Sequence, residues 1–297
     1  MGSNPVVKFF ESILTLNGSY HWGAVWQFLF RTEVLQGVLL TLIMAVLAQL
    51  VGSLIGLALY FVRRSRLRVL RGIGQAYVWF FRGTPLLVQI VFLYNFLPII
   101  HVARPLIHTN LFQHLGFVDA TPLDAFIAAF IALSFNEGAY MAEIVRAGID
   151  SIDPGQMEAA RSLGMTSWQG MRCIVLPQAL RVIVPPLGNE FNSMLKSTSL
   201  ASTIGVFELL EVANAFAFTG NVLEALTAAA IWYLTLTTVW SFIQASIERK
   251  LNASNIDPSQ LGQGPWLGRV FGNIFVRTRP AGAPVTDVAL PVPLDHR

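Results

Sequence analysis

The chain carries little charge for its length. Only 12% of its 297 residues are Asp, Glu, Lys or Arg, whereas 54% are hydrophobic, and soluble domains have about 25% charged residues. The hydrophobic residues come in long runs rather than in the periodic faces of half-buried elements. These features argue against a soluble protein and predict an all-α protein that crosses a membrane.

Several kinds of functional group are scarce or missing. Cys173 is the single cysteine, which excludes an internal disulfide and predicts an inert thiol. No Gly-rich loop ends in Lys-Ser or Lys-Thr, so the chain is not expected to bind ATP through a Walker motif. Three of the five histidines, His101, His108 and His114, are spaced loosely for a metal site. No nucleophile–base pair stands out, so we predict a non-enzymatic chain that binds no metal.

Five hydrophobic stretches are long enough to cross a membrane, which takes about 20 helical residues. Two of them, 34–62 and 225–247, contain no charged residue. The others are 84–100, 124–147 and a stretch from Val182 onward. We therefore predict five transmembrane helices, the first of which also acts as an uncleaved insertion signal.

Local signals predict where some of these spans begin or break. Thr84 and Pro85 are typical of an N-cap and a first helical residue. Arg82, just before them, is then expected at the cytoplasmic end of that span. The fifth span is expected to be broken by helix-breaking and polar residues, namely Pro185, Pro186, Gly188, Glu190 and Lys196.

Arginines alternate between the two sides of the predicted spans. The stretch after the first span is rich in arginine, loop 101–121 holds only Arg104, and the later cytoplasmic segments are basic again. Since cytoplasmic loops carry the excess of Lys and Arg, we predict residues 1–33 outside and the C-terminus in the cytoplasm, in the inner (cell) membrane. The tail 251–297, rich in Pro, Gly and polar residues, is predicted to be disordered. The net charge of +3 follows from these arginines and requires no nucleic acid.

A polar segment, 153–177, stands out on the predicted cytoplasmic side. It opens with an Asp-Pro capping pattern, and Gly164 is suited to end the first short helix in the left-handed conformation. Thr166 and Gln169 predict a capping box for a second helix, and Pro177 is expected to mark its far end. The result is a helix–glycine–helix elbow. Its composition fits either a loop on lipid headgroups or a part that docks in a groove of another protein.

The spacing inside this elbow resembles a known motif. Glu158-Ala159-Ala160, Gly164, Ile174 and Leu176-Pro177 fall at the positions of the EAA loop of bacterial ATP-binding-cassette (ABC) importer permeases. Four further stretches are similar to the polar amino-acid branch of that family, which includes histidine, glutamine and arginine permeases. They are FFRGTPLLVQI, GAYMAEIVRAGIDSI, LPQALRVIVPPLGNEF and LKSTSLASTIGVFELL, and the resemblance as a whole covers about residues 34–247.

The resemblance implies a type I ABC importer permease fold for 34–247, in which the chain forms half of the translocation pathway for a polar amino acid. The elbow is then the coupling helix that contacts a separate ATP-hydrolysing subunit. The residues so implicated are Glu158, Ala159, Ala160, Gly164, Leu176 and Pro177. ATP and Mg²⁺ belong to that partner, and this chain binds no cofactor. The implied assembly contains a second permease subunit (the same chain or a sister chain), two ATP-binding-cassette subunits and an extracytoplasmic amino-acid-binding protein.

Two polar features lie inside predicted spans. Glu137 is near the middle of the fourth, where a charge costs about 2.5–3.5 kcal/mol. The run Lys196–Thr203 is expected to interrupt the fifth, and broken helices near the midplane are where transporters bind substrates. One hypothesis is that an amino acid's carboxylate meets Lys196, Ser197, Thr198, Ser199 and the next half-helix, while Glu137 attracts its ammonium group. The alternative is that Glu137 and Lys196 neutralise each other or line a subunit contact.

Other functions stay open on the sequence alone. An ABC permease for another small solute would share the elbow. An ion-driven secondary transporter could use Glu137 as its ion site. The elbow and the lack of a recognisable inverted repeat argue against the second of these.

Overall fold

The computed structural model describes residues 21–99, 123–217 and 222–252, all within a single compact unit that ends at Asn252. Every regular element in these residues is helical, as the composition predicts. The predictions for residues 1–20 and for the tail from 253 lie outside the described residues.

Three long helices are apolar enough to cross a membrane: α3 (Thr32–Arg63), α7 (Leu123–Asp150) and α12 (Val222–Asn252). Two further candidates are bent pairs. The chain bends by 107° between α4 (Arg68–Gly83) and α5 (Leu86–Phe96). It bends by 49° between the helical path Ser167–Ile204 and α11 (Leu209–Ala217). The part of the chain described here therefore has three to five spans, and five is reached only if each bent pair crosses once.

The α3–α7 pair has the most extensive helix–helix contact of the fold, because glycines let the two backbones approach closely. Gly52 and Gly56 form a small-xxx-small pair on α3, a pattern that favours close helix packing in membranes. A Cβ on Gly56 would stand 2.3 Å from the Cβ of Met141 on α7, and one on Gly138 would stand 2.5 Å from Ile55. A side chain at either of these glycine positions would therefore have no room.

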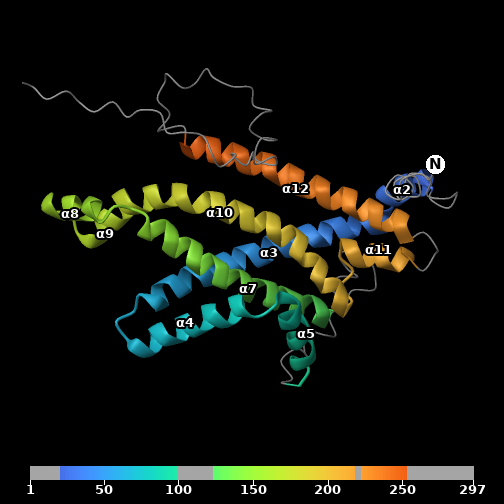
Figure 1. Cartoon of the computed structure of the whole chain (residues 1–297), viewed down its shortest axis with the longest axis horizontal. Helices are drawn as coiled ribbons and strands as arrows, with labels where there is room; N and C mark the ends of the chain where they lie inside the picture. Colours follow the sequence, from blue (N-terminus) through green and yellow to red (C-terminus); the bar gives the residue numbers. More distant parts are fainter. Residues whose placement is uncertain (1–20, 100–122, 218–221, 253–297) are drawn as a thin grey trace, which may run out of the picture. The chain divides into compact units, whose positions relative to one another are not determined.

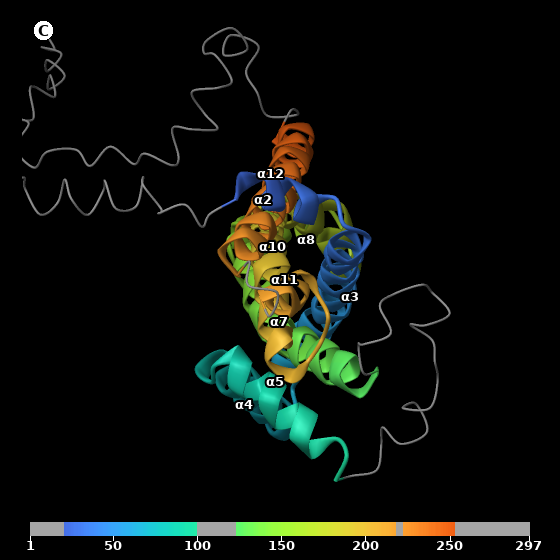
Figure 2. The same ribbon diagram turned by 90° about the vertical axis from the view of Figure 1, so that its right-hand side faces the viewer.

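The bend between α4 and α5 is held by side-chain hydrogen bonds. Thr84 is not an N-cap, because its hydroxyl donates to the Phe80 carbonyl at 2.9 Å and α5 begins two residues later. Gln89 donates to the carbonyls of Phe81 and Thr84, and Asn136 of α7 donates to Phe81 at 2.8 Å. The expected span 84–100 is thus a shorter helix whose start is fastened to α7. Figures 1 and 2 show α4 and α5 on the opposite side of α7 from α12.

The fifth predicted span is not broken at its prolines. One helical path runs through α9 (Ser167–Gly170), a π turn (Met171–Val175), α10 (Leu176–Ser197) and a 3₁₀ segment (Thr198–Ile204). Pro177 follows the wide π turn, where a missing N–H is tolerated, so it does not end the helix. Gln244 and Trp240 of α12 donate to the carbonyls of Pro185 and Gly188, and such bonds from a neighbouring helix support proline-containing turns.

The path ends instead at Gly205. Its φ of +80° lies in the left-handed region, which favours glycine. The chain then restarts as α11. A short helix, α2 (Trp22–Leu29), packs against α12 and closes an apolar cluster with α11 and the start of α3. The indole N–H of Trp232 donates to the Leu29 carbonyl at 3.0 Å and fixes α2 there.

Candidate coupling elbow and buried polar cluster

The elbow at 153–177 begins with α8 (Pro154–Ser162), as the capping pattern predicts. The carboxylate of Asp153 accepts a hydrogen bond from the Gly155 N–H at 2.8 Å, which satisfies one free donor at the helix start. At the other end Gly164 has φ +80°. Its N–H donates to the Arg161 carbonyl, and the next N–H donates to Ala160. This is the Schellman pattern that terminates a helix at glycine.

The second half of the elbow starts with a complete capping box. The Thr166 hydroxyl accepts from the Gln169 N–H, and the Gln169 side chain accepts from the Thr166 N–H at 2.8 Å. The two halves then touch, since a Cβ on Gly170 would stand 2.7 Å from the sulfur of Met157 and 3.4 Å from the Cβ of Ala160. The elbow is therefore braced by backbone caps and by a close contact between its arms, and Figure 1 shows α8 and α9 at the opposite end of the helices from α2 and α11.

The surface of the elbow is part apolar and part charged. Ala160 is buried between the arms, whereas Glu158 and Ala159 are exposed. Leu163 is 82% exposed and Trp168 is 69% exposed. Leu163 was not singled out from the sequence, because a single leucine before a glycine carries no distinguishing pattern. Two large apolar side chains held out by a braced turn form a surface suited to burial against another molecule.

Leu176 and Pro177, the other EAA-loop positions, lie beyond this turn. Both are exposed and stand at the start of α10, directly after the π turn. They continue the helical path that connects the elbow with the membrane-spanning part of α10. Movement of the elbow would therefore reach α10 without an intervening flexible loop.

Glu137 lies in the α3–α7 contact and is 4% exposed. A Cβ on Gly52 would stand 2.6 Å from its side chain, so α3 covers it closely. Within the described residues its Oε1 accepts no hydrogen bond, and Oε1 of neighbouring Gln49 also accepts none. A buried carboxylate oxygen without a hydrogen bond is unfavourable, and a hydrogen-bond donor placed beside it would stabilise it.

Arg82 is exposed and lies in the last turn of α4, and its place at the cytoplasmic end of a span stays a prediction. Its guanidinium stands 5.2 Å from the ring centre of Tyr140 on α7. Arg82 and Glu190 of α10 are close enough to interact electrostatically, as are Glu190 and Glu137. The bend after Gly83 makes α4 a separate helix, and this brings Arg82 towards the middle of α7.

The polar run from Lys196 is not joined to Glu137. Lys196 is exposed and forms no ion pair with any described residue. Each following hydroxyl bonds to the carbonyl of an earlier turn: Ser197 to Ser193, Thr198 to Leu195 and Ser199 to Lys196. The run tightens into a 3₁₀ helix instead of breaking, so the helix gap expected there comes only at Gly205. The N–H groups of Gly205, Val206, Glu208 and Leu209 are all hydrogen-bonded.

A second buried carboxylate, Glu208, follows that gap and was not recognised from the sequence. It is fully buried and accepts hydrogen bonds from the hydroxyls of Tyr233 at 2.6 Å and Thr41 at 3.4 Å. It also accepts from the N–H of Glu211 at 3.0 Å, and so caps the start of α11. One side chain thus connects α3, α11 and α12. The available signal was a carboxylate in a largely apolar run, three residues after a glycine.

The family is decided by comparison with known sequences. Residues 50–253 match the family described as "Binding-protein-dependent transport system inner membrane component". The chain belongs to this family. The matched part contains the elbow, Glu137 and Glu208, whereas α2 lies outside it.

Relatives of this transport component extend over most of the chain. A probable amino-acid permease, YxeN of Bacillus subtilis, is 37% identical over 76% of this chain and 96% of its own length. The arginine transport system permease ArgU of Corynebacterium glutamicum is 38% identical over 78% of this chain and 72% of its own length. The crystal structure of an amino acid ABC transporter with histidines has a TM-score of 0.61 and 36% identity, and covers 73% of this chain and 94% of that one.

These matches confirm that the protein is an inner-membrane component of a transport system with an ABC permease fold. The prediction of family from the elbow motif was correct. The roles of individual elbow and pathway residues stay predictions.

Proposed function

We propose that this permease forms half of the pathway of an ATP-driven importer for a polar amino acid, and that ATP is hydrolysed by a separate subunit. The single observation that carries the proposal is the braced elbow, which presents Leu163 and Trp168 outward on the path into α10. A permease needs such a surface because it has no nucleotide site of its own. The names of the relatives support an amino acid as the solute.

The elbow would act by rigid-body transmission. A conformational equilibrium is shifted only by something that binds the two states differently. If a pair of ATPase subunits closes around ATP and Mg²⁺, it draws two docked elbows together. Each elbow is continuous with α10 through the π turn, and α10 contacts α7 and α12. Movement of the elbow would therefore be passed through α10 to these two helices. This scheme requires a second permease subunit, the same chain or a sister chain, and an extracytoplasmic binding protein to deliver the substrate.

The substrate pathway is proposed at Glu137 and its neighbours. The unsatisfied Oε1 of Glu137 suits the ammonium group of an amino acid, and Arg82 with Glu190 provides an adjacent charged pair. Lys196 and the hydroxyls of Ser197, Thr198 and Ser199 remain candidates for the carboxylate end. Their hydroxyls already bond to their own helix, so Lys196, which is free of an ion pair in the described part of the chain, is the stronger of these candidates.

The test is uptake by proteoliposomes that contain the permease, its ATPase and its binding protein. ATP on the ATPase side should drive accumulation of a radiolabelled polar amino acid, and omission of the ATPase should abolish it. Competition with unlabelled amino acids, sugars and peptides identifies the solute class. Accumulation driven by an ion gradient without the ATPase would refute the proposal, and so would exclusive competition by a sugar or a peptide.

A further inference from the structure

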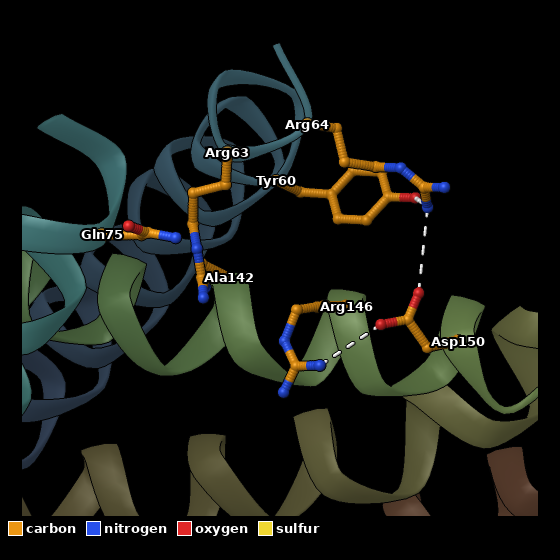
Figure 3. Close-up of a pocket in the computed structure, with 7 residues that line it drawn as sticks. All are labelled: Tyr60, Arg63, Arg64, Gln75, Ala142, Arg146 and Asp150. Atoms are coloured by element: carbon orange, nitrogen blue, oxygen red, sulfur yellow. Dashed lines mark hydrogen bonds and ion pairs between the residues drawn. The ribbon is translucent and has the colours of Figure 1, made fainter. Parts of the chain in front are cut away.

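An open cavity of about 250 Å³ lies where the ends of α3 and α7 meet the first half of α4, and Figure 3 shows its lining. It is far larger than the roughly 30 Å³ that one water molecule occupies. The residues around it are Tyr60, Arg63, Arg64, Gln75, Ala142, Arg146 and Asp150. Three of the seven are arginines, so the cavity suits an anion.

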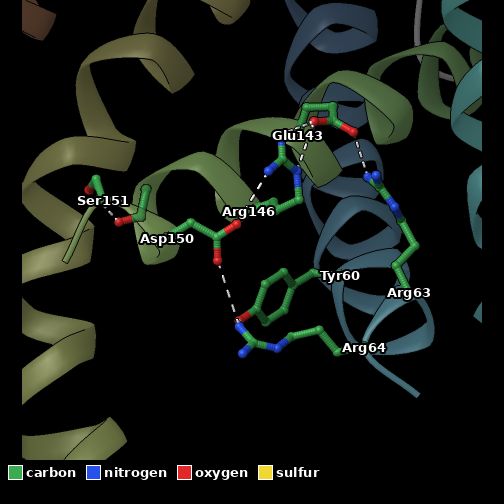
Figure 4. A network of polar contacts seen from close by, with 8 residues as sticks. Tyr60, Arg63, Arg64, Glu143, Arg146, Asp150 and Ser151 are labelled. Atoms are coloured by element: carbon green, nitrogen blue, oxygen red, sulfur yellow. Dashed lines mark hydrogen bonds and ion pairs between the residues drawn. The ribbon is translucent and has the colours of Figure 1, made fainter. Parts of the chain in front are cut away.

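The ion pairs behind the cavity leave it with excess positive charge. Figure 4 shows the network: Glu143 pairs with both Arg63 and Arg146, and Arg146 also pairs with Asp150 at 3.2 Å. Three guanidinium groups therefore face two carboxylates. Arg63 and Glu143 are each about one-fifth exposed and hold α3 and α7 together, and of the two only Arg63 lines the cavity.

Among the arginines of this network, Arg64 is the one without a hydrogen bond to a carboxylate. It is 61% exposed and stands 3.8 Å from Asp150, too far for a hydrogen bond. Among the described residues its hydrogen bond is the one donated to the Tyr60 hydroxyl at 2.7 Å. A guanidinium has five N–H donors, so most of them face the cavity or solvent. Tyr60 orients the group, and Gln75 offers a further amide from the α4 side.

The place of the cavity favours a lipid over a soluble anion. It opens at the end of the uncharged α3 run, within the basic stretch that begins at Arg63. Trp79 lies one turn beyond Gln75 on the same face of α4 and is 77% exposed. A phospholipid with its phosphate in the cavity could lay an acyl chain along this face, whereas a free phosphate would leave the face uncovered.

We propose that this cavity binds the phosphate group of an anionic phospholipid from the cytoplasmic leaflet, with Arg64 as its main ligand. Basic pockets between membrane helices on the cytoplasmic side are suited to such headgroups. A phosphate takes two parallel hydrogen bonds from one guanidinium, and Arg64 has the free donors for this. The proposal rests on the orientation predicted from the distribution of arginines and on the proposed function as a transporter, but it does not depend on which solute is carried.

The test measures lipid retention by the intact transporter, permease and ATPase together. The complex is placed in nanodiscs of phosphatidylglycerol and phosphatidylcholine, then released and analysed by native mass spectrometry. The unchanged protein should retain phosphatidylglycerol preferentially. Arg64→Gln should lower that preference roughly tenfold, because it removes the charge-assisted hydrogen bonds between a guanidinium and the phosphate. Tyr60→Phe, which keeps the ring and removes the hydroxyl that orients Arg64, should give a smaller loss.

Arg68→Gln is the matched control, because Arg68 belongs to the same basic stretch, is exposed and does not line the cavity. It should leave the preference unchanged. An equal loss in Arg68→Gln and Arg64→Gln would overturn the proposal in favour of diffuse surface charge. Displacement of the lipid by inorganic phosphate would also overturn it and indicate a soluble ligand. Since retention is measured without transport, failure here leaves amino-acid import standing, and failed import leaves the lipid result standing.

Discussion

Replacement of Gly164 by valine tests the elbow most directly. The glycine has φ +80°, and no atom of the described residues, its chain neighbours aside, lies within 4 Å of the position that a Cβ would take. The substitution therefore causes no collision, and its cost is confined to the backbone. An L-residue in the left-handed region costs about 1–2 kcal/mol. A change of that size shifts the ratio of native to altered elbow roughly 5- to 30-fold.

We expect Gly164→Val to lower ATP-driven uptake by a comparable factor while the helical bundle stays folded. Uptake and ATP hydrolysis are measured in the same proteoliposomes, and thermal unfolding of the purified complex reports on the fold. Gly205→Val is the control for strain, because Gly205, just after the 3₁₀ segment that follows α10, has the same φ and equally open space. It should affect stability similarly without separating hydrolysis from uptake. If Gly164→Val kept wild-type uptake per ATP, the elbow would not transmit force.

Three other substitutions test packing and the buried carboxylates. Gly56→Leu should destabilise the fold by about 1–3 kcal/mol or more, because its Cβ would meet α7 backbone at 2.8 Å; Gly72→Ala, with open space, should not lower the melting temperature. Glu208→Ala should lower it through a loss of about 1–3 kcal/mol, since the buried hydroxyl of Thr41 and the half-buried hydroxyl of Tyr233 lose their acceptor. Glu208→Gln should lose less, and equal losses would contradict the hydrogen-bond account. Glu137→Gln should raise the KM for uptake with little change in melting temperature, and an unchanged KM would exclude an ammonium-binding role.

Much of the elbow could be predicted from sequence because its signals are local. Helix caps depend on side chains within three or four residues of the backbone groups they bond, so Thr166 with Gln169 and Gly164 were sufficient. Pro177 was misjudged because its effect depends on a π turn before it. Pro185 was misjudged because its turn is supported by α12, which is distant in sequence.

For the buried polar residues, the sequence indicated that a residue is unusual but did not indicate its neighbours. Glu137 was recognised as unusual because a carboxylate in an apolar run is costly wherever it points. Its neighbours could not be known, since Glu190 interacts with it only through the α7–α10 contact. Arg82 in turn comes near Glu190 and Tyr140 only because the chain bends by 107° before α5. The pairing with Lys196 expected from charge alone does not occur.

The amino-acid sequence by itself determined that the chain is helical, lies in a membrane and carries a capped elbow, because these properties follow from hydrophobic run length and from contacts along the chain. Only the tertiary structure decided which charges meet. The network at Glu143, the cap at Glu208 and the surroundings of Glu137 all join helices far apart in sequence, and glycines such as Gly52 and Gly56 set how closely those helices approach.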